Sequence, residues 1–327
     1  MTAPSPALVQ ALRPRIIERR ARLQAATGSI SADYVNDLLS EIDAALQRID
    51  DGSYGVCETC HDSIEVDRLR VDPLTRFCLD HMSAAQLRAH EQDLELATRI
   101  QARLLPPGEV TLKHWAAHYR YQAAGAVGGD YCELIPSPDG ESLFFAVGDV
   151  SGKGVAASLL MTHLSAILRS LLPLEMRLTD LIAHANRQFC ESTAAEHYAT
   201  LVCGRTTTNG VEICNAGHCR PLLLRRNATE RIDPTGLPLG LFCGAGYSAR
   251  EFRLDDGDSL ALYSDGITEA QDAEGNEYEE ERLTCSLRLH ADRDSRTMAD
   301  GVLQDVARFR NRAPQNDDIT LLIVRRR

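Results

Sequence analysis

The first third of the chain carries three helical patterns of hydrophobic and polar positions. Leu12, Ile16 and Leu23 share one helical face, and a second apolar stripe runs over residues 35–49. These two stripes predict a short antiparallel helical hairpin. A third stripe covers residues 83–105, which contain no glycine or proline, and ends at Pro106-Pro107. This third pattern predicts one long amphipathic helix.

The remaining two thirds of the chain change to short apolar runs bounded by turn residues, which predict strands. The clearest runs are residues 143–148, 198–203, 211–214, 222–224, 260–263 and 319–324. Helical patterns at about 155–171, 178–192 and 296–311 lie between them. Many strands in series with clustered helices are typical of an α+β fold with antiparallel sheets.

Length and composition narrow the class of protein. With 327 residues, 44% hydrophobic and 25% charged, the chain is long enough for more than one folded domain. Its net charge of -12, from 35 basic and 47 acidic side chains, argues against direct nucleic-acid binding. No run of 18 apolar residues and no signal-peptide pattern occur. We therefore expect a cytoplasmic protein with no membrane span.

Four metal-ligand residues fall into two close pairs. Cys57 and Cys60 are separated by two residues, and so are Cys78 and His81, seventeen residues further on. Tetrahedral zinc favours such a set, and four protein ligands leave no open position, so this spacing predicts one structural Zn²⁺. His61 is an alternative ligand that breaks the paired spacing. The other interpretation is free cysteines near a surface histidine.

The segment 54–60, together with Cys78, resembles the DksA/TraR-type zinc finger. His81 takes the place of the fourth cysteine common in that family. We assign residues 1–82 to a first domain, a helical hairpin plus this zinc finger. Relatives of the module contact RNA polymerase, so a transcription-associated binding adaptor that uses the zinc finger is the alternative function.

Residues 83–107 form the predicted linker helix. Its apolar positions are Leu87, Leu94, Leu96, Ile100 and Leu104. One interpretation is that this stripe packs on the neighbouring domain, and the other is that it forms a homodimer. The stretch 94–106 resembles the segment that precedes SpoIIE/RsbU-type phosphatase domains.

Aspartates stand at the ends of the predicted strands. They are Asp130, Asp149, Asp265 and the pair Asp317-Asp318. A single Asp-Gly turn is usually only a turn. Several carboxylates brought together repel one another, however, and a divalent cation with oxygen ligands relieves that repulsion. Because no histidine or cysteine accompanies them, the expected metal is Mg²⁺ or Mn²⁺.

Six motifs, in order, resemble the metal-dependent protein phosphatase (PPM) family in its SpoIIE/RsbU branch. They lie at residues 127–131, 148–154, 215–218, 237–240, 263–269 and 316–320. The resemblance implies two packed antiparallel β-sheets flanked by helices over residues 108–327, with two Mn²⁺ or Mg²⁺ ions in a cleft. It implies a protein serine/threonine phosphatase that hydrolyses phosphoserine or phosphothreonine. The implied substrate is a phosphorylated anti-sigma-factor antagonist (STAS) protein in a partner-switching pathway.

The same resemblance implies the site residues. It gives Asp149 as ligand of both ions, Asp130 and the backbone carbonyl of Val150 as ligands of the first, and Asp265 and Asp317 as ligands of the second. Asp318 is the adjacent alternative to Asp317, and Asp149 and Asp265 are the central catalytic residues. Lys153 stands where the family often has histidine, so the general acid stays unassigned. His218, in Asn-Ala-Gly-His, is interpreted as part of a structural turn.

Overall fold

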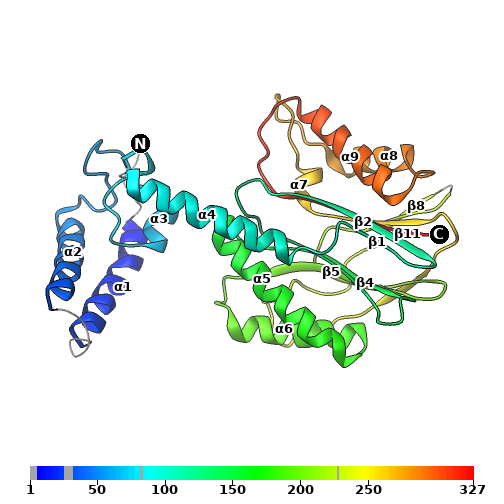
Figure 1. Ribbon diagram of the computed structural model, residues 1–327, viewed down its shortest axis with the longest axis horizontal. Helices are drawn as coiled ribbons and strands as arrows, with labels where there is room; N and C mark the ends of the chain where they lie inside the picture. Colours follow the sequence, from blue (N-terminus) through cyan, green and yellow to red (C-terminus); the bar gives the residue numbers. More distant parts are fainter. Residues whose placement is uncertain (1–5, 26–31, 82–83, 227) are drawn as a thin grey trace. The chain divides into compact units, whose positions relative to one another are not determined.

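The computed structural model describes residues 6–25, 32–81, 84–226 and 228–327. These residues divide into two compact units, Met1–Asp93 and Leu94–Arg327. The first unit contains α1 (Pro6–Ala25), α2 (Ala32–Asp51), α3 (Val66–Val71) and the 3-10 helix η1 (Leu79–His81) (Figure 1). Helix α4 (Ala84–Leu104) begins in the first unit and ends in the second.

The helical hairpin predicted for the first unit is present. Arg13 of α1 pairs with Asp50 of α2 at 3.1 Å, and Arg20 pairs with Asp43 at 2.9 Å, so the two helices run antiparallel. The stripe that contains Leu12 is buried between the helices and the zinc-finger segment. The connection at residues 26–31 lies outside the described residues.

The second unit is built on two antiparallel sheets. Its strands are β1 (Glu109–Thr111), β2 (Trp115–Gln122), β3 (Asp130–Pro136), β4 (Leu143–Val150), β5 (Ala199–Thr206), β6 (Gly210–Ala216), β7 (Leu222–Leu224), β8 (Thr229–Arg231), β9 (Arg250–Arg253), β10 (Ser259–Tyr263) and β11 (Ile319–Arg326). One sheet has the order β1-β2-β11-β10-β7-β8, and the other has the order β3-β4-β5-β6-β9.

Helices cover the outer face of each sheet (Figure 1). They are α5 (Gly154–Leu171), the 3-10 helix η2 (Leu172–Leu174), α6 (Leu178–Ser192), α7 (Asp265–Thr268), α8 (Glu279–Leu289) and α9 (Ser295–Arg310). Helices α5 and α6 share a core with the five-stranded sheet, whereas α8 and α9 share one with the six-stranded sheet. This arrangement confirms the α+β fold of two packed sheets flanked by helices.

Strand β4 shows why the central strands are apolar at successive positions. Leu143, Phe145 and Val147 belong to the core between the two sheets. Phe144 and Ala146 belong to the core under α5 and α6. Because side chains alternate between the two faces of a strand, a strand buried on both faces reads as a continuous apolar run.

Among the described residues, one segment, Gly154–Leu174, is long and apolar enough to cross a membrane. It contains α5, whose side chains Ala157, Met161, Leu164 and Leu168 are buried in the core against the five-stranded sheet. Its apolar composition is therefore accounted for by packing within the domain.

Candidate functional site

Four chain segments bring the predicted aspartates to one end of the two sheets. Asp130 is the first residue of β3 and lies directly opposite Asp149 of β4 in the strand register. Asp265 begins α7 immediately after β10, and Asp317-Asp318 precede β11, the hydrogen-bonded neighbour of β10. The structure therefore gathers all five predicted carboxylates in one region.

A buried hydrogen bond joins the two sheets at this point. Thr320 of β11 donates its hydroxyl to Asp130 Oδ2 at 2.5 Å, and both residues are buried. Burial raises the pKa of Asp130 well above its ordinary value, and the nearby Asp149 and Asp318 raise it further, although the Thr320 hydrogen bond lowers it. Asp130 is thus held in a fixed position beside other carboxylates.

The charged forms of Asp149 and Asp265 are also destabilised. Burial raises the pKa of Asp149 to about 7, with further contributions from Asp265, Asp317 and Asp318. Burial, followed by the charge of Asp317, also raises the pKa of Asp265. This donor set of crowded carboxylate oxygens without nitrogen or sulfur fits hard divalent cations such as Mg²⁺ or Mn²⁺.

The adjacent residues Asp317 and Asp318 are placed very differently. Asp318 is buried, and its two carboxylate oxygens accept hydrogen bonds from the backbone N–H groups of Ala124 (2.8 Å) and Gly129 (2.6 Å). Asp317 is 44% exposed at its side chain and accepts from Lys153 Nζ at 2.8 Å. The Asp318 carboxylate is therefore held by the backbone of the 124–129 loop. The Asp317 carboxylate also accepts from the Asp318 N–H at 2.9 Å, but its side chain remains partly exposed.

Glycine at position 128 is required by this packing. A Cβ atom there would collide with the Asp318 carboxylate and with the Tyr121 hydroxyl. The Gly-Gly-Asp sequence thus lets the 124–129 loop approach Asp318 closely enough to donate to it.

Lys153 and Asp317 stand where three surface pockets meet. The pockets have volumes of about 190, 470 and 280 Å³, and these two residues line all of them. Asp149 lines the second and third, and Asp265 lines the third. Lys153 Nζ also donates to the backbone carbonyl of Asn316 at 2.9 Å. An anionic substrate entering these pockets would therefore meet one ammonium group beside the carboxylates.

His218 lies inside a turn and also lines the third of these pockets. Its backbone N–H donates to Asn215 Oδ1 at 2.8 Å, and its ring Nδ1 lies 2.8 Å from Thr200 Oγ1. Burial lowers the pKa of His218 to about 4, so the ring is uncharged at neutral pH. These contacts support the interpretation of His218 as a structural residue of the turn.

Gln101 of α4 is a site-supporting residue that the sequence patterns did not reveal. Its buried amide donates to Gly128 O at 2.7 Å and accepts from Gly128 N at 3.1 Å. One turn earlier, Thr98 donates to Ala126 O at 2.8 Å. The C-terminal part of α4 therefore holds the loop that leads into Asp130. In the sequence, a buried glutamine on a helix looks the same as an exposed one.

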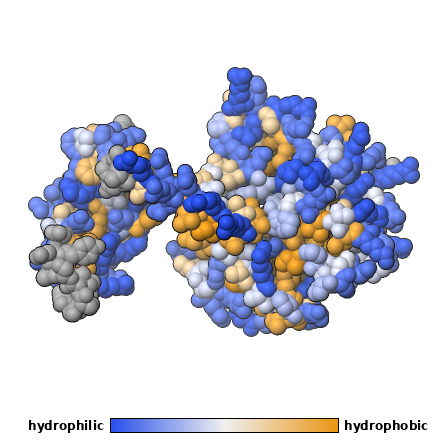
Figure 2. Space-filling view, viewed as in Figure 1, coloured by the Kyte–Doolittle hydropathy of each residue, from blue (hydrophilic) through white to orange (hydrophobic). Residues whose placement is uncertain are grey.

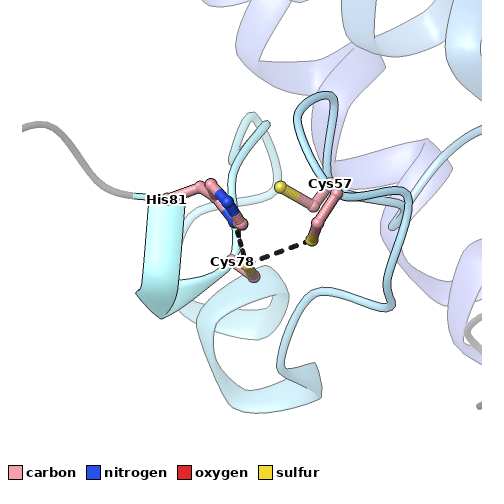
Figure 3. A group of neighbouring side chains, drawn as sticks. Cys57, Cys78 and His81 are labelled. Carbon is pink, nitrogen blue, oxygen red and sulfur yellow. Dashed lines mark hydrogen bonds between the residues drawn. The ribbon is translucent and has the colours of Figure 1, made fainter.

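The four predicted zinc ligands lie together in the first unit, and Figure 3 labels three of them, Cys57, Cys78 and His81. The candidate ligand atoms of Cys57, Cys60, Cys78 and His81 are all within 4.8 Å of one another. Cys60 Sγ lies 3.7 Å from Cys78 Sγ, which in turn lies 3.2 Å from His81 Nδ1. A tetrahedral zinc ion with Zn–S bonds of about 2.3 Å separates two sulfurs by about 3.8 Å, so the group fits zinc. His61 is not part of it.

The environment of the thiols also fits a bound cation. Burial alone would raise the pKa of Cys57, but backbone N–H groups of Cys60, Cys78 and Thr59 bring it down to about 6. The N–H of Asp62 lowers the pKa of Cys60, but burial and the adjacent Cys57 and Cys78 thiols raise it to about 11. The backbone thus favours a thiolate at Cys57, whereas the neighbouring thiols disfavour a second thiolate at Cys60. A bound divalent cation would stabilise both thiolates.

Comparison with known sequences bears on both units. The family model "Stage II sporulation protein E (SpoIIE)" matches residues 139–327, more than half of the chain. The model "Prokaryotic dksA/traR C4-type zinc finger" matches residues 52–80, a range that contains the three cysteines and stops just before His81.

Two curated proteins and a solved structure are similar to the chain. Protein IcfG of Synechocystis sp. is 24% identical over 264 residues, which cover 72% of this chain and 41% of IcfG. Phosphoserine phosphatase RsbU of Bacillus subtilis is 25% identical over 244 residues, covering 72% of this chain and 71% of RsbU. The SiaA-PP2C domain of Pseudomonas aeruginosa superposes with a TM-score of 0.64 at 21% identity, covering 75% of this chain and 99% of that domain.

Proposed function

The chain belongs to the SpoIIE family, and from this premise we propose that it hydrolyses phosphoserine and phosphothreonine on a protein substrate. A PP2C-type phosphatase domain and a DksA/TraR-type zinc finger are its two recognisable modules. The observation that carries the proposal is that Asp149, Asp265 and Asp317 line open pockets and the buried Asp130 lies opposite Asp149, with raised pKa values at Asp130, Asp149 and Asp265.

The residues proposed to hold two Mn²⁺ or Mg²⁺ ions are Asp130, Asp149, the backbone carbonyl of Val150, Asp265 and Asp317. When bound, such ions supply Lewis-acid activation of water and neutralise charge on the phosphoryl group. We propose Asp317 rather than the adjacent Asp318 as the ligand, because the Asp318 side chain is buried against the N–H groups of Ala124 and Gly129, whereas the Asp317 side chain is 44% exposed. Its proposed role is to position the loop that precedes Asp130.

Lys153 is proposed to orient the substrate phosphate. It is 70% exposed at its side chain, lines all three pockets and pairs only with groups on the Asn316-Asp317 segment in the described part of the chain. An ammonium group can move from Asp317 to a phosphate oxygen, because exposed ion pairs of this kind are worth only about 0–1 kcal/mol. Lys153 would thus bind the phosphate without being the general acid.

We propose a phosphorylated STAS-type anti-sigma-factor antagonist as the substrate, in a partner-switching pathway. The support is the similarity to RsbU, a phosphoserine phosphatase. Phosphate release should be measured with Mn²⁺ on a generic phosphoserine peptide and on phosphorylated STAS proteins, with Asp149→Asn as control. Phosphate release from the peptide but not from the STAS proteins would support the phosphatase activity and refute the proposed substrate class. Release from neither substrate would refute both proposals.

The zinc module is proposed to bind one structural Zn²⁺ through Cys57, Cys60, Cys78 and His81. We propose functional limits of 1–82 for the zinc-finger domain, 83–107 for the linker helix and 108–327 for the phosphatase domain. The division of the chain within α4, between Asp93 and Leu94, supports a linker role for that helix.

A homodimer through α4 is also proposed. Its apolar residues Leu87, Leu96 and Ile100 are 41%, 49% and 52% exposed. On α5, Leu159 is 65% exposed, and Figure 2 shows apolar side chains gathered over that helix. Light scattering should give the mass of two chains, and Leu96→Asp with Ile100→Asp should give the mass of one. We further propose a cytoplasmic location without membrane attachment, supported by the burial of α5 in the domain core.

A further inference from the structure

Two cysteines outside both metal centres, both in the second unit, are close enough for their side chains to interact. Cys190 is on α6, two residues before its end, and Cys243 is in the connection between β8 and β9. Both are free thiols. Cys243 is exposed, and Cys190 is half-buried.

Hydrogen bonds hold the Cys243 segment against α6. Asn186, one helical turn before Cys190, donates its amide to the carbonyls of Phe242 (2.9 Å) and Cys243 (3.3 Å). The same side chain accepts from Gly240 N at 2.9 Å, and Cys190 Sγ lies 3.5 Å from Gly240 O. Residues 240–243 are therefore fixed on the face of α6 that carries Cys190.

The two thiols differ in a way that suits sequential oxidation. Burial raises the pKa of Cys190 to about 11, and the adjacent Cys243 thiol adds to this shift. Cys190 is thus protonated and less reactive at neutral pH, so the solvent-exposed Cys243 is the sulfur that a peroxide oxidises first. An exposed cysteine beside a second, shielded cysteine is the arrangement in which one sulfur is oxidised and the other resolves it to a disulfide.

We propose that Cys190 and Cys243 form a redox pair that closes to a disulfide in the presence of a peroxide. The Cys243 sulfur attacks hydrogen peroxide, the O–O bond breaks, and water leaves with a sulfenic acid on Cys243. The Cys190 sulfur then attacks that sulfur, the S–O bond breaks, and hydroxide leaves with the Cys190 proton as a second water. Two thiols are oxidised by two electrons and one peroxide is reduced to two waters. A dithiol reductant then reduces the disulfide to the two thiols by thiol–disulfide exchange and is itself oxidised.

The test uses the full-length, zinc-loaded protein, because the zinc-bound thiols must stay protected. Reduced protein is treated with hydrogen peroxide, blocked with N-ethylmaleimide and digested with trypsin. We expect peptides 188–205 and 232–250 to appear as one linked species, two hydrogens lighter than the pair, that dithiothreitol separates. Fragmentation must place the link at Cys190, since peptide 188–205 also contains the fully buried Cys203.

Variants make the result specific. Cys190→Ser should abolish the linked species and leave a Cys243 sulfenic acid that dimedone traps, and Cys243→Ser should abolish both. Cys285→Ser removes another exposed thiol, on α8, and should leave the link unchanged. The proposal is overturned if peroxide-treated unmodified protein gives no linked peptides and Cys243 is no more oxidised than the control thiol Cys285. Because the readout is a covalent link, it does not depend on phosphatase activity.

Discussion

Asp130 and Asp149 are direct cross-strand partners, the last such pair at the site end of β3 and β4 before Val150. Their side chains are fixed by the register of two buried strands, so their mutual repulsion cannot be relieved by moving apart. The pKa of Asp130, raised chiefly by burial, is raised further by the charge of Asp149. The strand pairing therefore builds a place where a cation is favoured.

Asp149→Asn should lower phosphate release by about 100-fold or more, and Asp265→Asn should do the same. Loss even of groups that only support metal ligands costs about 10- to 100-fold, and these residues are proposed as ligands themselves. Steady-state release from a phosphoserine peptide with Mn²⁺ measures the effect. Lys113→Ala, a change at the chain's one lysine other than Lys153, should retain full activity. Substantial turnover by Asp265→Asn would contradict the site assignment.

Substitutions at the adjacent residues Asp317 and Asp318 should have different effects, the first on metal binding and the second on the stability of the fold. Asp317→Asn should weaken Mn²⁺ binding, measured by calorimetry, while changing the free energy of unfolding by less than about 1 kcal/mol, because its ion pair is exposed. Asp318→Asn loses a charged acceptor of two backbone N–H groups and should lower that free energy by about 2 kcal/mol. If Mn²⁺ binding were lost only in the Asp318 variant, Asp318 rather than Asp317 would be the metal ligand.

Cys57→Ser should remove zinc without removing catalysis. Structural zinc contributes about 10–16 kcal/mol in isolated zinc-finger peptides, so the first unit should lose its folded structure when this ligand is lost. Elemental analysis should find one zinc per chain in the unmodified protein and none in the variant. Both should hydrolyse a phosphoserine peptide with Mn²⁺. His61→Ala is the matched control and should keep its zinc. Zinc retained by Cys57→Ser would show that a different ligand set binds it.

Gln101→Leu should impair the phosphatase site although the side chain touches no proposed metal ligand. The change leaves the N–H and C=O of Gly128 without partners, at a cost of about 1–3 kcal/mol for each buried group. We expect weaker Mn²⁺ binding and at least about tenfold slower phosphate release. Gln92→Leu makes the same replacement at an exposed position of α4 and should have no effect. Equal behaviour of the two variants would remove the link between α4 and the site.

His218 should make the second unit less stable in mild acid. The folded pKa is about 4, below the ordinary value of about 6.5, so between these values the unfolded chain binds a proton that the folded chain does not. Stability from this group is complete above pH 6.5 and falls by up to about 3 kcal/mol as the pH drops toward 4. Urea unfolding followed by the single tryptophan, the buried Trp115, reports on this unit.

His218→Gln should reduce the loss of stability between pH 7.5 and 5, whereas His114→Gln, at a partly exposed position, should not. Other buried groups also titrate in this range, so the difference between variants is the measurement that matters. An unchanged pH dependence in His218→Gln would mean that the ring is not kept neutral by burial.

Helices with strong apolar periodicity were predicted closely from the sequence. The patterns at 155–171, 178–192 and 296–311 correspond to α5, α6 and α9, and the apolar runs correspond to the central strands. Helix α8 was missed because its first turn is Glu279-Glu280-Glu281 and few apolar residues follow. Strand β2 was missed because it buries His118 and alternates poorly, being covered on both faces.

The candidate site also has features that the sequence predicted and features that it did not. Carboxylates at strand ends could be recognised from their spacing, because apolar strands and Asp-Gly turns are local features. The distinct placements of Asp317 and Asp318 could not, since they depend on contacts with the 124–129 loop, almost 200 residues away in the sequence. Gln101 was missed for the same reason. A hydrogen bond to Gly128 leaves no trace in helical periodicity.

The alternation of β4 side chains between two cores has a consequence for how the molecule unfolds. Phe145 packs between the sheets, and its neighbours Phe144 and Ala146 pack under the helices, so neither layer can be lost without disrupting the other. The second unit should therefore melt as one cooperative transition. The first unit's core consists of its own residues, and it should melt separately, at a temperature that depends on zinc rather than on manganese.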